Sequence, residues 1–190
     1  MPLEIVTIGE PVLRARAAEV SDDELRSPEF QLFLDELVET MRAANGAGIA
    51  APQVGVSKRV FAVEVRDNPR YPYKPNLQLR VLVNPVVRPL SAETFSVSEG
   101  CLSIPDLRGE LRRFAEVEVE YTARAGERVS EVIRGLSAGT FQHEQDHLDG
   151  ILFVDRVEDT RSLTTWAAFR AHHEEGVAAR AREIVARWGS

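Results

Sequence analysis

The amino-acid sequence predicts an α+β fold with a helix near each end of the chain and a further helix that carries two histidines. Apolar residues recur at helical spacing in one N-terminal and one C-terminal segment, and β-branched residues are concentrated in three segments between them. The chain has 190 residues, of which 44% are hydrophobic and 28% charged, so it can bury an adequate core. We expect one domain that spans residues 1–190.

The N-terminal helix is predicted to begin at Ser27-Pro28, which combines a helix cap with a proline in the first turn. The apolar residues that follow at helical spacing are Phe30, Phe33, Leu34, Leu37, Val38 and Met41. Asn45-Gly46 then favours a helix end. We therefore expect this helix to lead directly into the small-residue segment that starts at Asn45.

Three segments rich in β-branched residues, 60–65, 79–83 and 117–121, are predicted as strands. The third alternates apolar and acidic residues, Val117-Glu118-Val119-Glu120, which indicates one buried and one solvated face. We expect these strands to pair antiparallel. Between the first two lie residues 66–76, with prolines at 69, 72 and 75, and this stretch is predicted as a surface loop.

A second long helix is predicted from about residue 159 to residue 188. The apolar residues that form one stripe along it are Trp166, Phe169, Val177, Ala181, Ile184 and Trp188. Such a stripe indicates packing on the core and not a cofactor site.

Charge and composition exclude several classes of function. The formal net charge of -7 argues against broad non-specific nucleic-acid binding, and we expect no direct DNA binding. No apolar run is long enough to span a membrane and no signal peptide is evident. A single cysteine permits no internal disulfide, which suits a reducing compartment. We expect a cytoplasmic protein without a membrane partner.

The segment Gln142-His143-Glu144-Gln145-Asp146-His147 contains two histidines four residues apart. On a helix such residues lie on one face, so His143 and His147 can hold one ion while Glu144 lies close enough to move a proton. This arrangement is typical of metal-assisted hydrolysis. The alternative is a pair of solvated histidines on a polar helix.

A catalytic zinc-type site needs a third protein ligand. The metzincin pattern, which places a histidine three residues after Gly150, fails because that position is Phe153. A glutamate on a later helix, Glu174 or Glu175, is a second candidate, although His172-His173-Glu174-Glu175 is typical of a solvated helix face. The third candidate is the thiol of Cys101.

Cys101 lies in Glu99-Gly100-Cys101-Leu102-Ser103-Ile104-Pro105, where the flanking glycine and proline favour an irregular loop or a strand end. A lone cysteine is otherwise a small core hydrophobe. Together with His143 and His147 it makes a Cys-His-His set that leaves the fourth tetrahedral position open, which is the mark of a catalytic site.

A third segment, Asn-Gly-Ala-Gly-Ile-Ala-Ala-Pro-Gln-Val-Gly at residues 45–55, contains small residues that allow close backbone approach. By itself it indicates only a turn after a helix. Taken with the Cys101 segment and the two-histidine segment, it strongly resembles the three signature motifs of the peptide deformylases, in that family's order. The resemblance runs from Pro11-Val12-Leu13-Arg14 to about Asp155, with a family-like helix after it.

The resemblance implies antiparallel β-sheets packed around a central metal-binding HExxH helix. It implies a hydrolase that removes the formyl group from the N-terminal formyl-methionine of newly synthesised polypeptides. Cys101, His143 and His147 would bind the metal, and Glu144 would act as general base and acid. Gln53 and the backbone N–H of Leu102 would stabilise the oxyanion, each donor being worth about 2.7 to 4 kcal/mol.

The same resemblance implies the cofactor and the partners. Ligand preference alone suits zinc, but the family implies Fe(2+) as the physiological ion, with Zn(2+), Ni(2+) or Co(2+) as substitutes. The implied partners are N-formyl-methionyl nascent peptides. For some family members a C-terminal helix docks on the ribosome near the tunnel exit, and the helix at 159–188 is a candidate for this contact.

The resemblance also implies substrate-binding residues, which are here Ala47, Gly48, Glu99, Gly100, Leu136, Gly139 and Thr140. Of these, Ala47, Leu136, Gly139 and Thr140 would line the pocket for the first side chain. Many relatives have larger apolar residues at Ala47, Gly139 and Thr140, which predicts a wider or more polar pocket. Ile49 and Arg112 also depart from the usual family residues. A Glu99–Arg113 pair is expected to fix the cysteine loop.

Two rival functions remain at the level of the sequence. One is an endopeptidase that uses His143, His147 and Glu174 or Glu175 as ligands. The other is a ribosome-associated binding protein that keeps the fold without turnover, although every residue that the chemistry needs is present.

Overall fold

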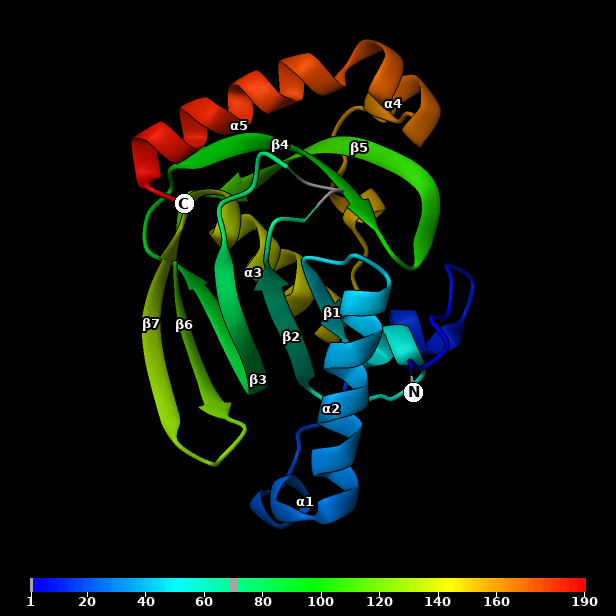
Figure 1. Ribbon diagram of the computed structural model, residues 1–190, viewed down its shortest axis with the longest axis vertical. Helices are drawn as coiled ribbons and strands as arrows, with labels where there is room; N and C mark the ends of the chain where they lie inside the picture. Colours follow the sequence, from blue (N-terminus) through cyan, green and yellow to red (C-terminus); the bar gives the residue numbers. More distant parts are fainter. Residues whose placement is uncertain (1, 69–71) are drawn as a thin grey trace.

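The computed structural model of the protein describes residues 2–68 and 72–190. Figure 1 shows its elements in sequence colours. The strands are β1 (Gly48–Ala50), β2 (Val60–Val65), β3 (Leu77–Pro89), β4 (Thr94–Cys101), β5 (Ile104–Phe114), β6 (Glu116–Ala123) and β7 (Arg128–Arg134). The α-helices are α1 (Asp22–Arg26), α2 (Pro28–Ala43), α3 (Gly135–Leu148), α4 (Trp166–His172) and α5 (Glu174–Trp188).

The strands form a five-stranded sheet in the order β1-β2-β3-β6-β7 and a two-stranded sheet of β4 and β5. All of these pairs are antiparallel, which confirms the predicted pairing. The helix α3 packs against strands of both sheets and against α5. The expected α+β fold around the histidine-bearing helix is therefore confirmed.

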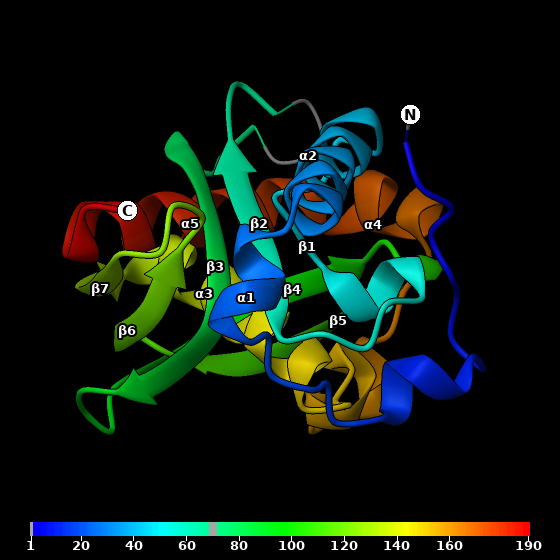
Figure 2. The ribbon, with the colours of Figure 1, turned by 90° about the horizontal axis from the view of Figure 1, so that it is seen from below.

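Strand β2 of the larger sheet lies between helices α2 and α3 (Figure 2), and both of its faces are buried. Side chains alternate along β2, so Phe61 and Val63 join the cluster that contains Phe141 of α3. The intervening residues Val60 and Ala62 join the cluster formed by α2. All six residues of β2 are consequently buried, and the strand shows no polar alternation.

Helix α2 begins and ends as the sequence predicts. The Ser27 hydroxyl accepts a hydrogen bond from the backbone N–H of Phe30 at 3.2 Å, and Pro28 occupies the first turn. At the other end Asn45 has a φ of 51°, a left-handed conformation that asparagine tolerates. The chain then enters β1, a short strand within the segment that the sequence indicated only as a turn.

The three predicted strands are present, and two of them are longer than expected. The structure also contains further strands. Residues 79–83 belong to β3, which continues to Pro89 beyond an irregularity at Asn84, whose φ is 49°. The strands β4, β5 and β7 were not predicted. A surface loop is expected at 66–76. Its described residues contain no helix, and β3 begins only after them, at Leu77. Residues 69–71 lie outside the described part.

The prediction of a single long helix over 159–188 is wrong. A short 3₁₀ turn at Thr160–Ser162 is followed by the separate helices α4 and α5, which meet at His173. The physical reason is that the apolar stripe is interrupted by four polar residues at 172–175, where a continuous helix would need an apolar residue. The predicted packing role is confirmed for Phe169, Val177, Ala181 and Ile184, all buried.

Helix α4 is fixed to the smaller sheet by Arg108 of β5. Its guanidinium lies 4.3 Å from the ring centroids of both Trp166 and Phe169, a cation–π arrangement. The same guanidinium donates to the Ser98 carbonyl of β4 at 2.6 Å.

Within the described residues, no helix is both long and apolar enough to cross a membrane.

Candidate metal centre

The structure brings Cys101, His143 and His147 together at the junction of the two sheets. Cys101 is the last residue of β4, and the histidines lie one turn apart on α3. One ligand atom from each residue lies within 4.8 Å of the others. Among the residues that the structure describes, this group of potential ligands contains neither Glu174 nor Glu175, so the endopeptidase ligand set is contradicted.

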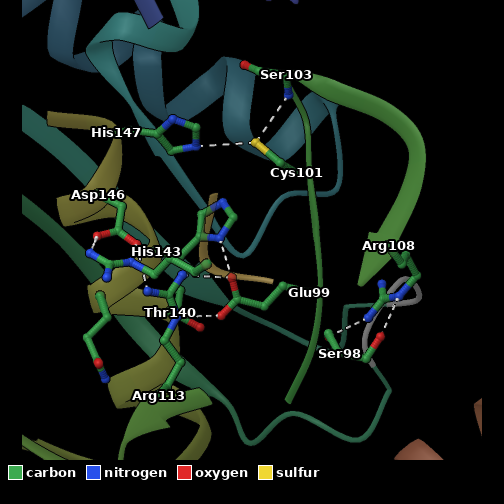
Figure 3. A network of polar contacts seen from close by, with 12 residues as sticks. Ser98, Glu99, Cys101, Ser103, Arg108, Arg113, Thr140, His143, Asp146 and His147 are labelled. Carbon is green, nitrogen blue, oxygen red and sulfur yellow. Dashed lines mark hydrogen bonds and ion pairs between the residues drawn. The ribbon is translucent and has the colours of Figure 1, made fainter. Parts of the chain in front are cut away.

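The three side chains are oriented by their neighbours (Figure 3). Glu99 contacts Nδ1 of His143 at 2.8 Å, while Nε2 of His147 lies 3.2 Å from Sγ of Cys101. Histidines that bind a metal commonly contact a carboxylate through the other ring nitrogen, which fixes the orientation of the ring. Nδ1 of His147 is buried without a hydrogen-bond partner within residues 2–68 and 72–190. This sulfur and imidazole donor set fits a divalent transition metal.

Glu144 lies in the same cavity, next to the small-residue segment. It is 3% exposed, and a Cβ atom added to Gly48 would lie 2.5 Å from its Oε1, so only glycine leaves room for this carboxylate. Burial raises the pKa of Glu144 to about 7, although His143 and Lys74 act in the opposite direction. A carboxyl group with this pKa can both accept and release a proton near neutral pH.

Gln53 is held beside the thiol by the 3₁₀ turn that follows β1. Its Oε1 accepts from the backbone N–H of Ala50 at 2.8 Å, which leaves the amide nitrogen pointing toward the cysteine loop. That nitrogen is 3.5 Å from Sγ of Cys101 and 3.3 Å from Oγ of Ser103. Leu102 lines the same cavity.

A buried ionic network holds Glu99, the carboxylate that contacts His143. Arg113 donates to both oxygens of Glu99 at 2.8 Å, which confirms the predicted pair, and also to Asp146 at 2.6 Å. Arg156 donates to both oxygens of Asp146, at 2.7 and 2.6 Å. Burial alone lowers the pKa of Arg113, but the two carboxylates outweigh it and the net shift is upward. Sequence reasoning missed Asp146 and Arg156, because the network forms around Arg113, which lies 33 positions before Asp146 on a different element.

The residues predicted to bind substrate all line one cavity, together with Cys101 and His143. They are Ala47, Gly48, Glu99, Gly100, Leu136, Gly139 and Thr140. Tyr73, Lys74 and Val97 also line it and were missed. The space beside Gly139 is not empty, because a Cβ atom there would lie 3.5 Å from the Phe95 ring and 3.7 Å from Cγ of Arg113.

Comparison with known proteins gives the family. A family model described as polypeptide deformylase matches residues 2–162. The chain is 43% identical over 163 residues to peptide deformylase 2 of a Nostoc species, covering 86% of this chain and 90% of the relative. The chain belongs to the polypeptide deformylase family.

Two solved structures extend this result. One is a class I type b peptide deformylase from Acinetobacter baumannii bound to Met-Ala-Ser, with a TM-score of 0.80 and 46% identity over 83% of this chain and 99% of that chain. The other is a peptide deformylase from Synechococcus elongatus in complex with actinonin, with a TM-score of 0.75 and 34% identity over 95% of this chain and 89% of that chain.

Membership in the deformylase family makes this chain a hydrolase of the N-formyl group of newly synthesised polypeptides. The family and the Cys-His-His cluster together support a metal cofactor. The rival hypothesis of a binding protein without turnover is therefore not retained.

Replacing Arg113 with methionine is expected to lower the free energy of unfolding by about 3 to 5 kcal/mol, because it leaves the buried carboxylates of Glu99 and Asp146 without their shared cation. Urea denaturation measures this. The control is Arg26→Met, whose ion pairs are exposed and worth about 0 to 1 kcal/mol. Equal effects of the two substitutions would contradict a structural role for the network.

Proposed function

We propose that this deformylase acts on formyl-methionyl nascent peptides, with a metal held by Cys101, His143 and His147 and with Glu144 as the proton-transferring group. The observation that carries the proposal is the position of Glu144. Its buried carboxylate lines the same cavity as Cys101 and His143, in the space that Gly48 leaves open. The Met-Ala-Ser peptide bound by the Acinetobacter enzyme supports a peptide substrate in this cavity.

The reaction is hydrolysis of an amide. Water adds to the formyl carbon, the carbon–nitrogen bond breaks, and the products are formate and a free N-terminal amine. Glu144 accepts the proton that the attacking water loses and delivers it to the leaving nitrogen. When bound, the metal supplies Lewis acidity and lowers the pKa of water.

The carbonyl oxygen gains negative charge during this addition. The amide nitrogen of Gln53 and the backbone N–H of Leu102 are the proposed donors to it. The contact between Oε1 of Gln53 and the Ala50 N–H supports this role, because it fixes which end of the amide faces the site. Donors that are already oriented need no rearrangement as charge develops.

The proposed physiological ion is Fe(2+), with Zn(2+), Ni(2+) or Co(2+) as substitutes. A thiolate and two imidazoles suit each of these ions, so the donor set supports the class of metal and the family resemblance supports iron. We further propose a cytoplasmic location, with contact to the ribosome near the tunnel exit through α4 and α5. The first side chain of the substrate would bind along Ala47, Leu136, Gly139 and Thr140.

The test is release of formate from a formyl-Met-Ala-Ser peptide by protein purified without oxygen and loaded with Fe(2+). We expect turnover that a metal chelator removes and that added Fe(2+) restores. An iron-loaded, folded protein that releases no formate would contradict the proposed function. Higher turnover by the zinc-loaded than the iron-loaded protein would contradict the choice of iron.

Treatment with peroxide is expected to inactivate the iron-loaded protein faster than a nickel-loaded or zinc-loaded sample. The reason is that a thiolate beside a redox-active ion is readily oxidised, and Cys101 is the single cysteine of the chain. Mass spectrometry of the peptide that contains Cys101 measures the oxidation alongside activity. Loss of activity at one rate in all metal forms, with Cys101 unmodified, would contradict this mechanism.

A further inference from the structure

The cavity contains one positive charge on a residue that the motifs do not include. The chain has two lysines, Lys58 and Lys74. Lys58 does not line the cavity, and its Nζ lies 2.7 Å from a carboxylate oxygen of Glu24. Lys74 lines the cavity with Cys101, Glu144 and Thr140. Lys74 comes from the segment between β2 and β3, so it reaches the site from an element separate from both β4 and α3.

The ammonium group of Lys74 is directed at the wall formed by α3. Its Nζ lies 2.9 Å from Oγ1 of Thr140, and that hydroxyl is 3.3 Å from the Leu136 carbonyl one turn earlier. The Thr140 hydroxyl can thus donate to Leu136 and accept from Lys74 at the same time. Burial lowers the pKa of Lys74 to about 8, while Glu99 and Glu144 oppose this shift, which agrees with an amine inside the cavity.

The α3 wall of the cavity contains the apolar side chain of Leu136, but its next two lining residues are not apolar beside Lys74. Gly139 has no side chain, and the Thr140 side chain presents its hydroxyl to the lysine. An apolar group that ends against this wall would take the charged ammonium further from water without offering it an acceptor, which is unfavourable. A group with an acceptor oxygen would instead bind the ammonium through a charge-assisted hydrogen bond.

We propose that Lys74 makes this pocket favour N-formyl peptides whose first side chain ends in a neutral hydrogen-bond acceptor, such as the sulfoxide of oxidised methionine or the carboxamide of glutamine. The inference rests on the proposed function, because it assumes that the first side chain enters the cavity beside Thr140. A carboxylate side chain is disfavoured, since Glu99 and Glu144 already place two carboxylates in the cavity.

The experiment compares formyl-Xaa-Ala-Ser peptides in which Xaa is norleucine, methionine or methionine sulfoxide. These side chains have similar length, so their kcat/KM ratios report on polarity. For Lys74→Met we expect the sulfoxide-to-norleucine ratio to fall roughly 10- to 100-fold relative to wild type, the effect of one hydrogen bond to a charged group. Lys74→Arg should retain most of the wild-type ratio, and Lys58→Met, the matched control, should retain all of it.

An unchanged sulfoxide-to-norleucine ratio in Lys74→Met would overturn the inference. If this variant does not fold, Thr140→Val provides the same comparison, because it removes the acceptor that positions the ammonium; an unchanged ratio there would likewise overturn it. The proposed function fails separately, if wild type releases no formate from the formyl-methionine peptide. If wild type turns over the formyl-methionine peptide but the sulfoxide-to-norleucine ratio does not depend on Lys74 or Thr140, the proposed specificity is wrong and the proposed function stands.

Discussion

Replacing Glu144 with alanine is expected to lower kcat/KM by about 100-fold or more while the metal stays bound. The carboxylate supplies proton transfer but is not one of the three converging ligand residues, so its loss removes chemistry and not coordination. Because Glu144 packs against Gly48 inside the cavity, alanine leaves space that water can enter and does not strain the backbone.

Metal content and turnover are measured on the same sample of Glu144→Ala. Glu144→Gln, which keeps the shape and removes the titrating oxygen, should show a similar loss of turnover. Glu174→Ala is the matched control, since this glutamate lies on α5 outside the ligand group. If the metal leaves with Glu144, the residue is a ligand and its assignment as proton carrier is wrong.

Local features of the site could be predicted from the sequence, because they depend on short spacings. The histidines of α3 lie four residues apart, and helical geometry alone places them on one face. The cap at Ser27 and the left-handed turn at Asn45, just after the end of α2, are equally local. Cys101 is different, since 42 residues separate it from His143; it was assigned through the resemblance of three motifs, and the structure places its sulfur beside His147.

Features that depend on distant partners could not be predicted. Asp146 looks like an ordinary polar residue of an HExxH helix until Arg113 and Arg156 are seen to meet on it. The strands β4 and β5 carry polar residues on much of their length, so their composition does not indicate strands. The Phe95 ring, which would lie 3.5 Å from a Cβ atom at Gly139, comes from β4 and is likewise a distant neighbour of the pocket.

Replacing Cys101 with alanine is expected to reduce metal affinity by more than about 100-fold, the upper end of the loss seen when only a residue that hydrogen-bonds to a ligand is removed. Two imidazoles remain, and the part of the chain that the structure describes offers no fourth His, Cys, Asp or Glu side chain to this group. Turnover should fall with metal content. Elemental analysis after dialysis, together with formate release, measures both.

The control for Cys101→Ala is His172→Ala, which removes an exposed histidine on α4 that does not belong to the ligand group. It should keep both metal and activity. The cysteine side chain is small and buried, so its loss is expected to leave the fold intact, and circular dichroism checks this. A folded Cys101→Ala protein that still holds one equivalent of metal and still releases formate would show that the thiol is only a core residue, and the catalytic site would then need another third ligand.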